Sequence, residues 1–395
     1  MIEKRLFHQL LLRIRHGAVK VTYWDGTTVT YGQGKPYFNL TIKSAKALRA
    51  VFKNLSLGFG EGYMDGQIDI DGGIDQPVRL RSENEDAFAT VTRLSLVRPP
   101  NVNIRAKQAP QIQHHYDLGN NFYKLWLDTS MTYSCAYFEK DGDTLEKAQS
   151  QKVDHLLRKL QLKKGHNLLD IGSGWGKLLI TAAKDYGIKG VGVTLSQEQW
   201  KHSTAAAKKA GVDGQVKFEL LNYQDLAERP GTHEAFDRII SVGMFEHVGQ
   251  KNQADYFRAV HKMLKPGALS VLHTITQEES RSTDPWTDKY IFPGGYIPSI
   301  HQIVDELPHH DFRVIDYENL RIHYAKTLDE WLRRFEAHKS TVLKMYDERF
   351  YRMWRLYLGS SSASFRYGGL SLSQVVFTKG LNNDLPLTRE FLYKQ

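Results

Sequence analysis

Three side chains in apolar stretches of the sequence could perform nucleophilic or acid–base chemistry. The only cysteine, Cys135, lies in TYSCAYF, Glu246 lies in GMFEHVG, and His273 lies in ALSVLHTI. A thiol nucleophile needs a neighbouring base, and no histidine and aspartate pair at hydrolase spacing accompanies Cys135. Each residue also has a structural interpretation: a small wall residue, a surface pair with His247, and a buried core histidine. The residue types alone leave the chemistry open.

A glycine-rich turn follows an apolar stretch in LLDIGSGWGKLL, residues 168–179. Gly172, Gly174 and Gly176 would let the backbone turn tightly and approach a ligand closely at the start of a helix. The G-x-G-x-G spacing, with Asp170 two residues ahead, differs from the G-x-G-x-x-G of dinucleotide-binding folds. It resembles motif I of S-adenosylmethionine (SAM)-dependent methyltransferases, where the acidic residue serves the methionine ammonium group. A purely structural turn in another α/β enzyme is the alternative.

The segments around this turn alternate between short apolar strands and amphipathic helices. Strands are predicted at 167–172, 190–195, 216–222, 236–242 and 268–275, and helices at 144–162, 178–187, 196–211 and 252–264. Such alternation indicates βαβ units and a parallel sheet. We therefore predict an α/β fold: a Rossmann-like SAM-dependent methyltransferase domain with a mainly parallel sheet. A long amphipathic helix is expected further on, over 331–359.

A small α+β domain is predicted ahead of the catalytic domain, at residues 1–95. It would contain a helix at 1–16, a hairpin at 20–32 around Asp25 and Gly26, a helix at 42–54, and Gly-rich turns with a short strand at 57–73. Prolines without apolar periodicity mark a linker at 96–111. The catalytic domain would span 112–395, with a lid loop at about 276–300 and a C-terminal helical segment.

Composition and charge narrow the possible partners. The chain has 395 residues and a formal net charge of +9, with nine Lys and Arg against two acidic residues in positions 1–50. A basic first segment suits an anionic membrane or a nucleic acid, or is only a solvated face. Because no nucleic-acid-binding motif accompanies it, we expect no nucleic acid partner. The single cysteine excludes an intramolecular disulfide, and the histidine pairs at 114–115 and 309–310 lack further ligands, so no metal site is expected.

Several motifs in the same order resemble the cyclopropane-fatty-acid synthase family, which includes the mycolic acid cyclopropane synthases. They are YDLGNNFYKLWLD (116–128), TYSCAYF (132–138), LLDIGSGWG (168–176), GVTLSQEQ (192–199), GMFEHVG (243–249), LHTI (272–275) and DPWTDKYIFPGG (284–295). The stretch GFGEGYMDG in the N-terminal domain resembles the branch that acts on bacterial phospholipids. Two positions depart from the family pattern: Gly62 stands where a small alanine is expected, and Ser173 where cysteine is frequent.

The resemblance implies a reaction. A methyl group from SAM is transferred to the cis double bond of an acyl chain in a membrane phospholipid, and a carbocation forms. Bound bicarbonate removes a proton from the added methyl group, and the cyclopropane ring closes. The alternatives are another SAM-dependent methyltransferase on this scaffold, with a methyl-branched lipid or a small-amine product, and a binding module that merely keeps the fold. Intact Asp170 and the three glycines argue against the last.

The same resemblance assigns site residues. The bicarbonate set carries over onto Cys135, Glu246, His273, Ile275 and Tyr324, with Cys135 and Ile275 acting through the backbone. The SAM-binding set carries over onto Tyr133, Ser134, Asp170, Gly172, Gly174, Gly176, Thr194, Gln199, Tyr223 and Gln224. A homodimer is implied. Since the sequence contains no signal peptide and no apolar stretch of transmembrane length, we expect a cytoplasmic enzyme, peripherally associated with the inner face of the membrane.

Overall fold

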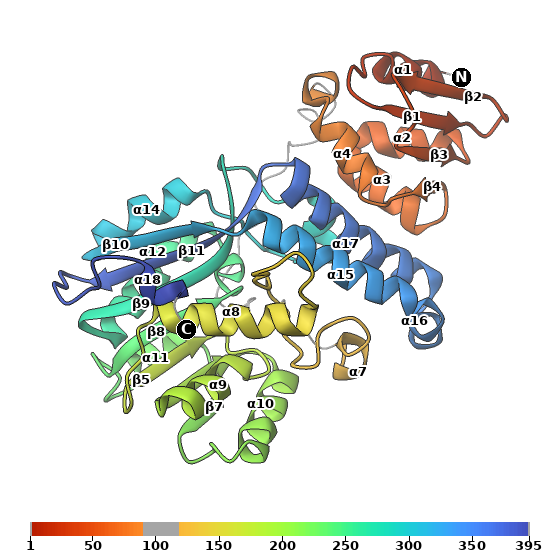
Figure 1. Ribbon diagram of the computed structural model, residues 1–395. Coiled ribbons are helices and arrows are strands. Elements are labelled where there is room, and N and C mark those ends of the chain that lie inside the picture. The colour runs from red at the N-terminus through yellow and green to blue at the C-terminus, as the bar shows by residue number, and fades with distance from the viewer. Residues whose placement is uncertain (1, 90–117, 394–395) are drawn as a thin grey trace. The chain divides into compact units, whose positions relative to one another are not determined.

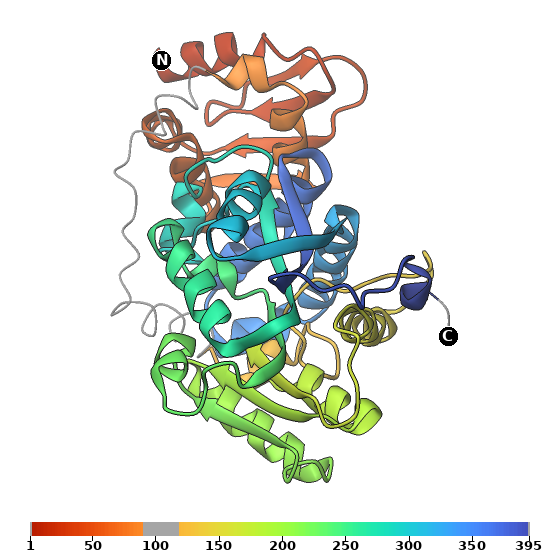
Figure 2. The ribbon, with the colours of Figure 1, turned by 90° about the vertical axis from the view of Figure 1, so that its left-hand side faces the viewer.

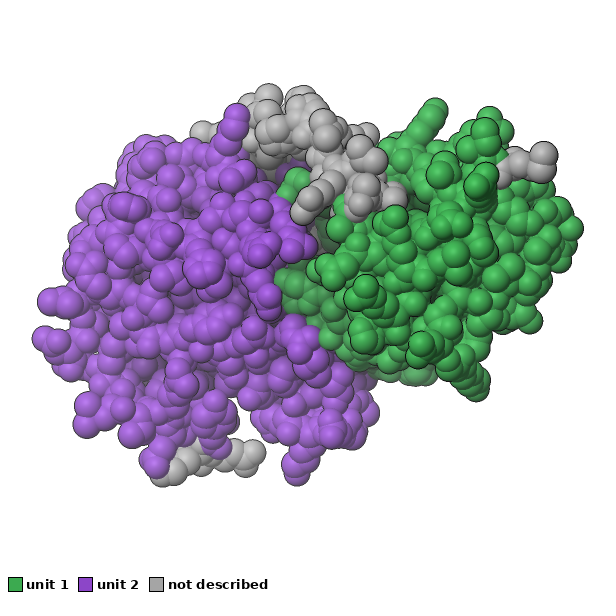
Figure 3. All heavy atoms as spheres, turned by 90° about the horizontal axis from the view of Figure 1, so that it is seen from above, with its two compact units in different colours: residues 1–101, 282–293, 328–370 green, residues 102–281, 294–327, 371–395 purple. Residues whose placement is uncertain are grey.

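The computed structural model describes residues 2–89 and 118–393, which fall into two compact units (Figure 3). Unit 1 consists of the described parts of residues 1–101, 282–293 and 328–370. Unit 2 consists of those of residues 102–281, 294–327 and 371–395. Unit 1 thus includes two segments that the sequence-based boundaries assign to the catalytic domain. The expected linker at 96–111 lies outside the described residues.

Unit 2 is built on a seven-stranded sheet with the order β10-β11-β9-β8-β5-β6-β7 (Figure 1). Its strands are β5 (Asn167–Ile171), β6 (Lys189–Thr194), β7 (Val216–Leu220), β8 (Phe236–Val242), β9 (Leu264–Gln277), β10 (Phe312–Asn319) and β11 (Leu370–Lys379). β5 pairs in parallel with β6 and β8, β6 with β7, and β8 with β9, whereas β10 and β11 are antiparallel. The prediction of an α/β fold with a mainly parallel sheet is therefore confirmed.

Helices cover both faces of this sheet because its strands are apolar on both sides. Neighbouring residues such as Leu168 and Leu169 belong to different core clusters, as the strand period of two requires. One cluster contains side chains of α8 (Leu145–Lys159), α9 (Lys177–Tyr186) and α10 (Gln197–Lys209). The other contains side chains of α11 (Tyr223–Glu228), α12 (Gln253–Met263) and α14 (Ile300–His309). The unit also contains the short helices α7 (Asn120–Tyr123) and α18 (Glu390–Tyr393).

Unit 1 contains a four-stranded sheet with the order β2-β1-β3-β4. Its strands are β1 (Ala18–Thr22), β2 (Thr28–Gly32), β3 (Phe38–Ile42) and β4 (Ile68–Gly72). The expected hairpin is present: β1 and β2 are antiparallel and Gly26 in the turn has φ +79°. The helices beside the sheet are α1 (Ile2–Leu11), α2 (Ala45–Lys53), α3 (Leu55–Met64) and α4 (Gln76–Ser82), and Figure 2 shows α1 in red next to the strands.

Helix α3 corrects the prediction of turns over its glycine-rich sequence. A Cβ at Gly58 would overlap the backbone of Ala50, and one at Gly60 would overlap the Trp286 indole on α13 (Pro285–Tyr290). The glycines therefore permit close helix packing, and burial outweighs their low helix propensity. Since Trp286 lies far away in sequence, local pattern could not reveal this. A Cβ at Gly62, the position where an alanine was expected, would stand 2.8 Å from Cδ1 of Ile68.

The prediction of one long helix over 331–359 is also wrong. The region forms three helices, α15 (Arg321–Ala337), α16 (Lys339–Met345) and α17 (Glu348–Tyr367). Tyr346 is extended, and the Asp347 side chain accepts a 2.7 Å hydrogen bond from the Phe350 backbone N–H, which caps α17. Amphipathic periodicity continues across this cap, so it hides the break. Across residues 2–89 and 118–393, no helix has the length and apolar character needed to cross a membrane.

Candidate functional site

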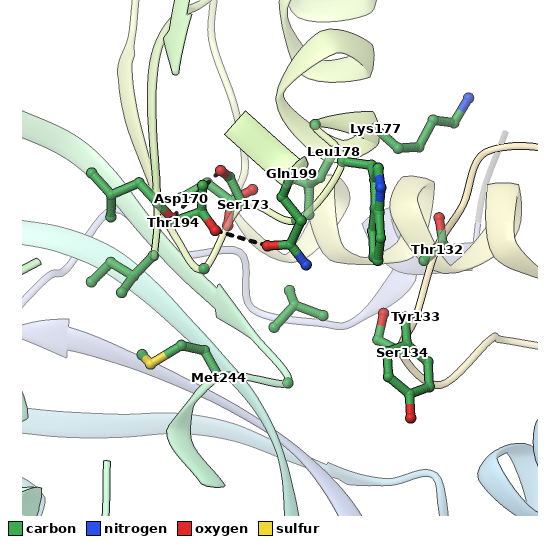
Figure 4. Close-up of a pocket in the computed structure, with 18 of the residues that line it drawn as sticks. Thr132, Tyr133, Ser134, Asp170, Ser173, Lys177, Leu178, Thr194, Gln199 and Met244 are labelled. Atoms are coloured by element: carbon green, nitrogen blue, oxygen red, sulfur yellow. Dashed lines mark hydrogen bonds between the residues drawn. The ribbon is translucent and has the colours of Figure 1, made fainter. Parts of the chain in front are cut away.

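A pocket lies at the carboxyl ends of β5, β6 and β8 in unit 2 (Figure 4). β5 has β6 on one side and β8 on the other, so the chain order reverses here. Open α/β sheets bind their ligands at such switch points. The pocket wall comes from six segments, at 130–134, 152–153, 170–178, 193–199, 221–223 and 242–248, and its volume including the mouth is about 1090 Å³. The sheet topology thus brings motifs distant in sequence to one cavity.

The structure gathers nine of the ten residues assigned to SAM on the wall of this pocket. They are Tyr133, Ser134, Asp170, Gly172, Gly174, Gly176, Thr194, Gln199 and Tyr223. Gln224 is not part of the wall. Its backbone N–H donates to Oδ1 of Asn222, and Asn222 is a wall residue. Their contacts with SAM remain a prediction.

The three glycines of the turn have different roles. All three have positive φ, of +86° at Gly172, +53° at Gly174 and +91° at Gly176. A Cβ on Gly172 would stand 2.8 Å from Met244, and one on Gly176 would stand 2.8 Å from Phe218. A Cβ on Gly174 would meet no heavy atom within 4 Å. Gly172 and Gly176 are therefore needed for packing and for the turn, whereas Gly174 leaves the wall open to a ligand.

A hydrogen bond orients Gln199 toward the pocket. The Thr194 hydroxyl donates to Gln199 Oε1 at 2.7 Å, and Figure 4 shows the amide nitrogen on the side of the cavity. Both residues are buried. Nucleotide-binding folds commonly place an acidic residue at the end of the second strand for ribose hydroxyls. Here the side-chain amide of Gln199 supplies a polar group near the end of β6.

Two buried charged residues, Asp170 and Lys152, lie on the same wall. Each is only 2% exposed. Burial raises the pKa of Asp170 to about 7, and its Oδ1 has no hydrogen-bond partner among the described residues. Burial lowers the pKa of Lys152 to about 8, against the attraction of nearby acidic groups, and its Nζ donates to Ser134 Oγ at 2.8 Å. Lys152 was not among the predicted site residues, although its place one turn from Ala148 and Leu156 on α8 marks a buried helix face.

Glu246, Ile275 and His273 come together at the ends of β8 and β9. The Ile275 backbone N–H donates to Glu246 Oε1 at 2.6 Å, whereas Glu246 Oε2 is buried without a partner in the described chain. Burial raises the pKa of Glu246. His273 is fully buried, and burial keeps its pKa well below the usual value, so the ring is neutral at pH 7. The Gln374 amide donates to His273 Nδ1 at 3.1 Å, which places the ring proton on Nε2.

The other two assigned residues belong to different segments. Cys135 is fully buried, and its Sγ–H donates to the carbonyl of Ala136 at 3.2 Å. Burial raises the pKa of this thiol, which stays protonated at neutral pH. The Ala136 N–H donates to Thr327 Oγ1 at 3.0 Å, which ties the TYSCAYF segment to α15, the helix that also carries Tyr324. Cys135 is thus a packed core residue that directly follows Ser134 of the pocket wall, and not a wall residue as expected.

These groups suit bicarbonate, an anion with one hydroxyl donor and several acceptor oxygens. Glu246 Oε2 can accept a hydrogen bond and His273 Nε2–H can donate one, and both atoms are buried without a partner among the described residues. Because the Ile275 N–H is already used by Glu246, Ile275 orients that carboxylate in this arrangement. Its direct contact with bicarbonate remains a prediction, as do those of Cys135 and Tyr324.

Comparisons with known proteins show which family the chain resembles. Residues 104–375 match the family model "Mycolic acid cyclopropane synthetase", and residues 6–93 match a domain of unknown function. The chain is 40% identical over 357 residues to cyclopropane-fatty-acyl-phospholipid synthase of Escherichia coli K12, covering 89% of this chain and 90% of that one. It is 34% identical over 394 residues to a probable fatty acid methyltransferase of Pseudomonas putida, covering 97% and 98%.

A solved structure of mycolic acid cyclopropane synthase CmaA1, complexed with S-adenosylhomocysteine (SAH) and CTAB, is also similar. It is 33% identical with a TM-score of 0.64, over 69% of this chain and 98% of that one. The family model covers well over half of the chain, and the two relatives match nearly all of it. The chain therefore belongs to the mycolic acid cyclopropane synthetase family, which it shares with cyclopropane-fatty-acyl-phospholipid synthases, and is a SAM-dependent methyltransferase.

Proposed function

We propose that this enzyme transfers the methyl carbon of SAM to the cis double bond of an unsaturated acyl chain in a membrane phospholipid and closes a cyclopropane ring. The observation that carries the proposal is that Glu246 Oε2 and His273 Nε2, from the neighbouring β8 and β9 segments, are both buried without a partner among the described residues. The segment of Glu246 also contributes Met244 and His247 to the pocket wall. A methyl group delivered in the pocket would therefore lie near groups that can hold a base.

SAM supplies an electrophilic methyl group when bound. An alkene is a weak nucleophile, so the chain must exclude water and hold the reactants in close contact. Tyr133 and Trp175 on the pocket wall belong to an aromatic cluster: the ring of Tyr123 lies 5.6 Å from that of Tyr133 and 5.5 Å from that of Trp175. Aromatic faces stabilise cations without reacting with them, which suits a carbocation in a dry site.

Bound bicarbonate would supply the base that removes the proton from the added methyl group. Residues of the chain would hold it: Glu246 Oε2 would accept from its hydroxyl, and the neutral His273 would donate from Nε2. Two anions side by side would repel each other. The raised pKa of Glu246 favours a proton shared between its Oε2 and the bicarbonate hydroxyl, which reduces this repulsion. The Glu246 carboxyl group can therefore lie next to bicarbonate in a buried site.

The experiment is transfer of the labelled methyl group of SAM into vesicles of unsaturated phospholipid, in buffer freed of carbon dioxide and then supplemented with bicarbonate. We expect label in the lipid, with a rate that falls on depletion and returns with bicarbonate. Transfer into lipid that does not respond to bicarbonate would contradict the proposed base. Absence of label from the lipid would contradict the proposed substrate.

Helix α1 supports peripheral association with an anionic membrane. Ile2 is 74% exposed, Leu6 54% and Leu12, just after the helix, 58%. Arg5 and Arg13 are exposed beside them. Exposed apolar side chains flanked by arginines suit an interface between water and anionic lipid. This association, on the inner face of the membrane in the cytoplasm, and a homodimeric state are part of the proposal.

Sedimentation with phosphatidylglycerol vesicles tests the membrane contact. The double substitution Leu6→Gln and Leu12→Gln should weaken binding. The control, Val304→Gln, changes a residue that is 40% exposed on α14 and should bind like the unchanged protein. Equal binding of all three proteins would contradict the role of α1.

A second candidate is a methyl-branched rather than a cyclopropane product. It is favoured by one observation: the relative that covers 97% of the chain is named a probable fatty acid methyltransferase. Both products begin with the same methyl transfer to an alkene, so the pocket does not separate them. The two products differ in the fate of the proton on the added carbon. The chemical structure of the product therefore distinguishes them.

A further inference from the structure

We propose that Lys152 binds the carboxylate of the methionine part of SAM, as a counterpart to Asp170 on the same pocket wall. This inference rests on the proposed use of SAM and adds a ligand-binding residue that neither the motifs nor the comparisons assign. It is carried by the position of Lys152 in the pocket wall, its burial and its unfilled donors.

Lys152 is a buried cation with little to balance it. Its side chain has only one hydrogen bond, from Nζ to Ser134 Oγ, although an ammonium group has three donors. Among the described residues, no carboxylate forms an ion pair with it, in contrast to Lys159 on the same helix, which pairs with Glu318 at 2.5 Å. Burying a charge without a partner is strongly unfavourable. The two remaining donors of Lys152 therefore call for an anionic partner in the pocket.

Asp170 presents the opposite case on the same wall. Its Oδ1 is buried without a hydrogen-bond partner in the described chain, and it does not pair directly with Lys152. The pocket therefore offers one buried negative and one buried positive group that are held apart. An α-amino acid group carries an ammonium and a carboxylate on one carbon, and it matches this pattern. The ammonium would meet Asp170 and the carboxylate would meet Lys152.

Ser134 places Lys152 relative to the rest of the pocket. Its hydroxyl accepts from Lys152, and its backbone carbonyl accepts from the Gln149 side chain at 2.8 Å, one turn earlier on α8. Figure 4 shows Ser134 and Asp170 on segments that approach the cavity from different directions. The segment assigned to the methionine part is thus fastened to the helix that carries the cation. An alternative role for Lys152 is only to fasten Ser134.

Calorimetric titration with SAM and with decarboxylated SAM separates the two roles. The unchanged protein should bind SAM roughly 10- to 100-fold more tightly than decarboxylated SAM, the range for one hydrogen-bonded charge pair. Lys152→Met should remove most of this preference, because it should weaken binding of SAM and leave that of decarboxylated SAM nearly unchanged. A matched control, Lys184→Met, removes an exposed charge from α9 and should keep the preference.

Three results would overturn the inference. One is an unchanged protein that binds both ligands equally, which needs no variant and so does not depend on how Lys152→Met folds. Another is a Lys152→Met protein that keeps the preference. The third is a Lys152→Met protein that loses affinity for both ligands equally while its thermal transition is unaltered. This result would indicate that Lys152 only fastens Ser134. Failure of the unchanged protein to bind SAM at all would instead contradict the proposed function.

Discussion

Glu246 and Ile275 are joined by a 2.6 Å hydrogen bond from the Ile275 backbone N–H to Glu246 Oε1. The bond depends on sheet register: β8 and β9 run in parallel with Val242 opposite His273, so the segments that follow lie side by side. One carboxylate oxygen is thereby fixed by backbone, and the other is left buried without a partner among the described residues. The sheet, rather than a flexible loop, sets the position of the carboxyl group.

Substitution of Glu246 by glutamine should reduce turnover more than cofactor binding. The amide oxygen of Glu246→Gln can still accept from Ile275, but an NH₂ donor replaces the acceptor Oε2. We expect kcat to fall by roughly 100-fold or more, the usual range for a group in proton transfer. The calorimetric Kd for SAH should change by less than about threefold, since the backbone of the pocket is kept. Glu278→Gln, at an exposed residue just beyond β9, is the control. Parallel losses of kcat and SAH affinity would argue against this role of Glu246.

The Gln374 amide should determine which nitrogen of His273 carries the proton. It donates to Nδ1, so Gln374→Leu should allow the ring to take the other tautomer and should lower kcat. Gln374→Glu should raise the pKa of His273, because a carboxylate next to the ring favours the charged imidazolium. The ¹⁵N chemical shifts of the His273 ring report both changes. Identical ring shifts in the unchanged protein and both variants would refute the assignment.

Substitution of Asp170 by asparagine should stabilise the ligand-free protein at alkaline pH. Burial raises the folded pKa of Asp170 from the ordinary 3.8 to about 7, so the folded state binds more protons between these values. Its stability therefore falls as the pH rises from about 4 to 7, and the full cost remains above 7. Asp170→Asn should be more stable by on the order of 2 to 4 kcal/mol at pH 8.5 and little different near pH 4.

Urea denaturation at both pH values, without SAM or SAH, measures this difference. The control is Asp185→Asn, at an exposed residue on α9, which should show no such pH-dependent gain. The same Asp170 variant should bind SAM more weakly, as expected where a functional charge is kept at the expense of stability. A variant that is less stable at pH 8.5 would be inconsistent with an unpartnered buried carboxylate.

The thiol of Cys135 should be dispensable for the chemistry. It is fully buried and protonated, so it cannot act as a nucleophile without leaving its place. Cys135→Ser should keep kcat within about threefold and lower the thermal midpoint slightly, because a hydroxyl replaces a packed sulfur. Thiol reagents should react with the unfolded but not with the folded protein. Loss of turnover in a folded Cys135→Ser protein that still binds SAM would show that the sulfur takes part in the reaction.

Much of the catalytic sheet could be predicted because each strand and helix has its own signal in the local sequence. β5 to β9 are short apolar runs separated by amphipathic helices with recognisable ends, such as the Ser196 cap before α10 and Gly187 after α9. The antiparallel pair β10 and β11 was missed. Helix α3 was missed partly because Gly60 packs against Trp286, which lies far away in sequence, and the break before α17 was hidden by continuous amphipathic periodicity.

The pocket was predicted more fully than the network around it. The family resemblance identified nine wall residues, and seven of them lie at or after the carboxyl ends of β5, β6 and β7, which meet at one edge of the sheet. Lys152 was missed because a lysine in a helix is ordinarily a surface residue. The use of the Ile275 N–H by Glu246 could not be foreseen, since it depends on the register of β8 and β9.

The structure of the lipid product tests the central claim most directly. The enzyme is incubated with SAM labelled with ¹³C in the methyl group, bicarbonate and vesicles of a phospholipid with one cis double bond, and the released fatty acids are studied by NMR and mass spectrometry. We predict chains heavier by one CH₂, without olefinic protons and with the label in a ring methylene. Labelled chains that keep a double bond or carry the label in a methyl branch would contradict it.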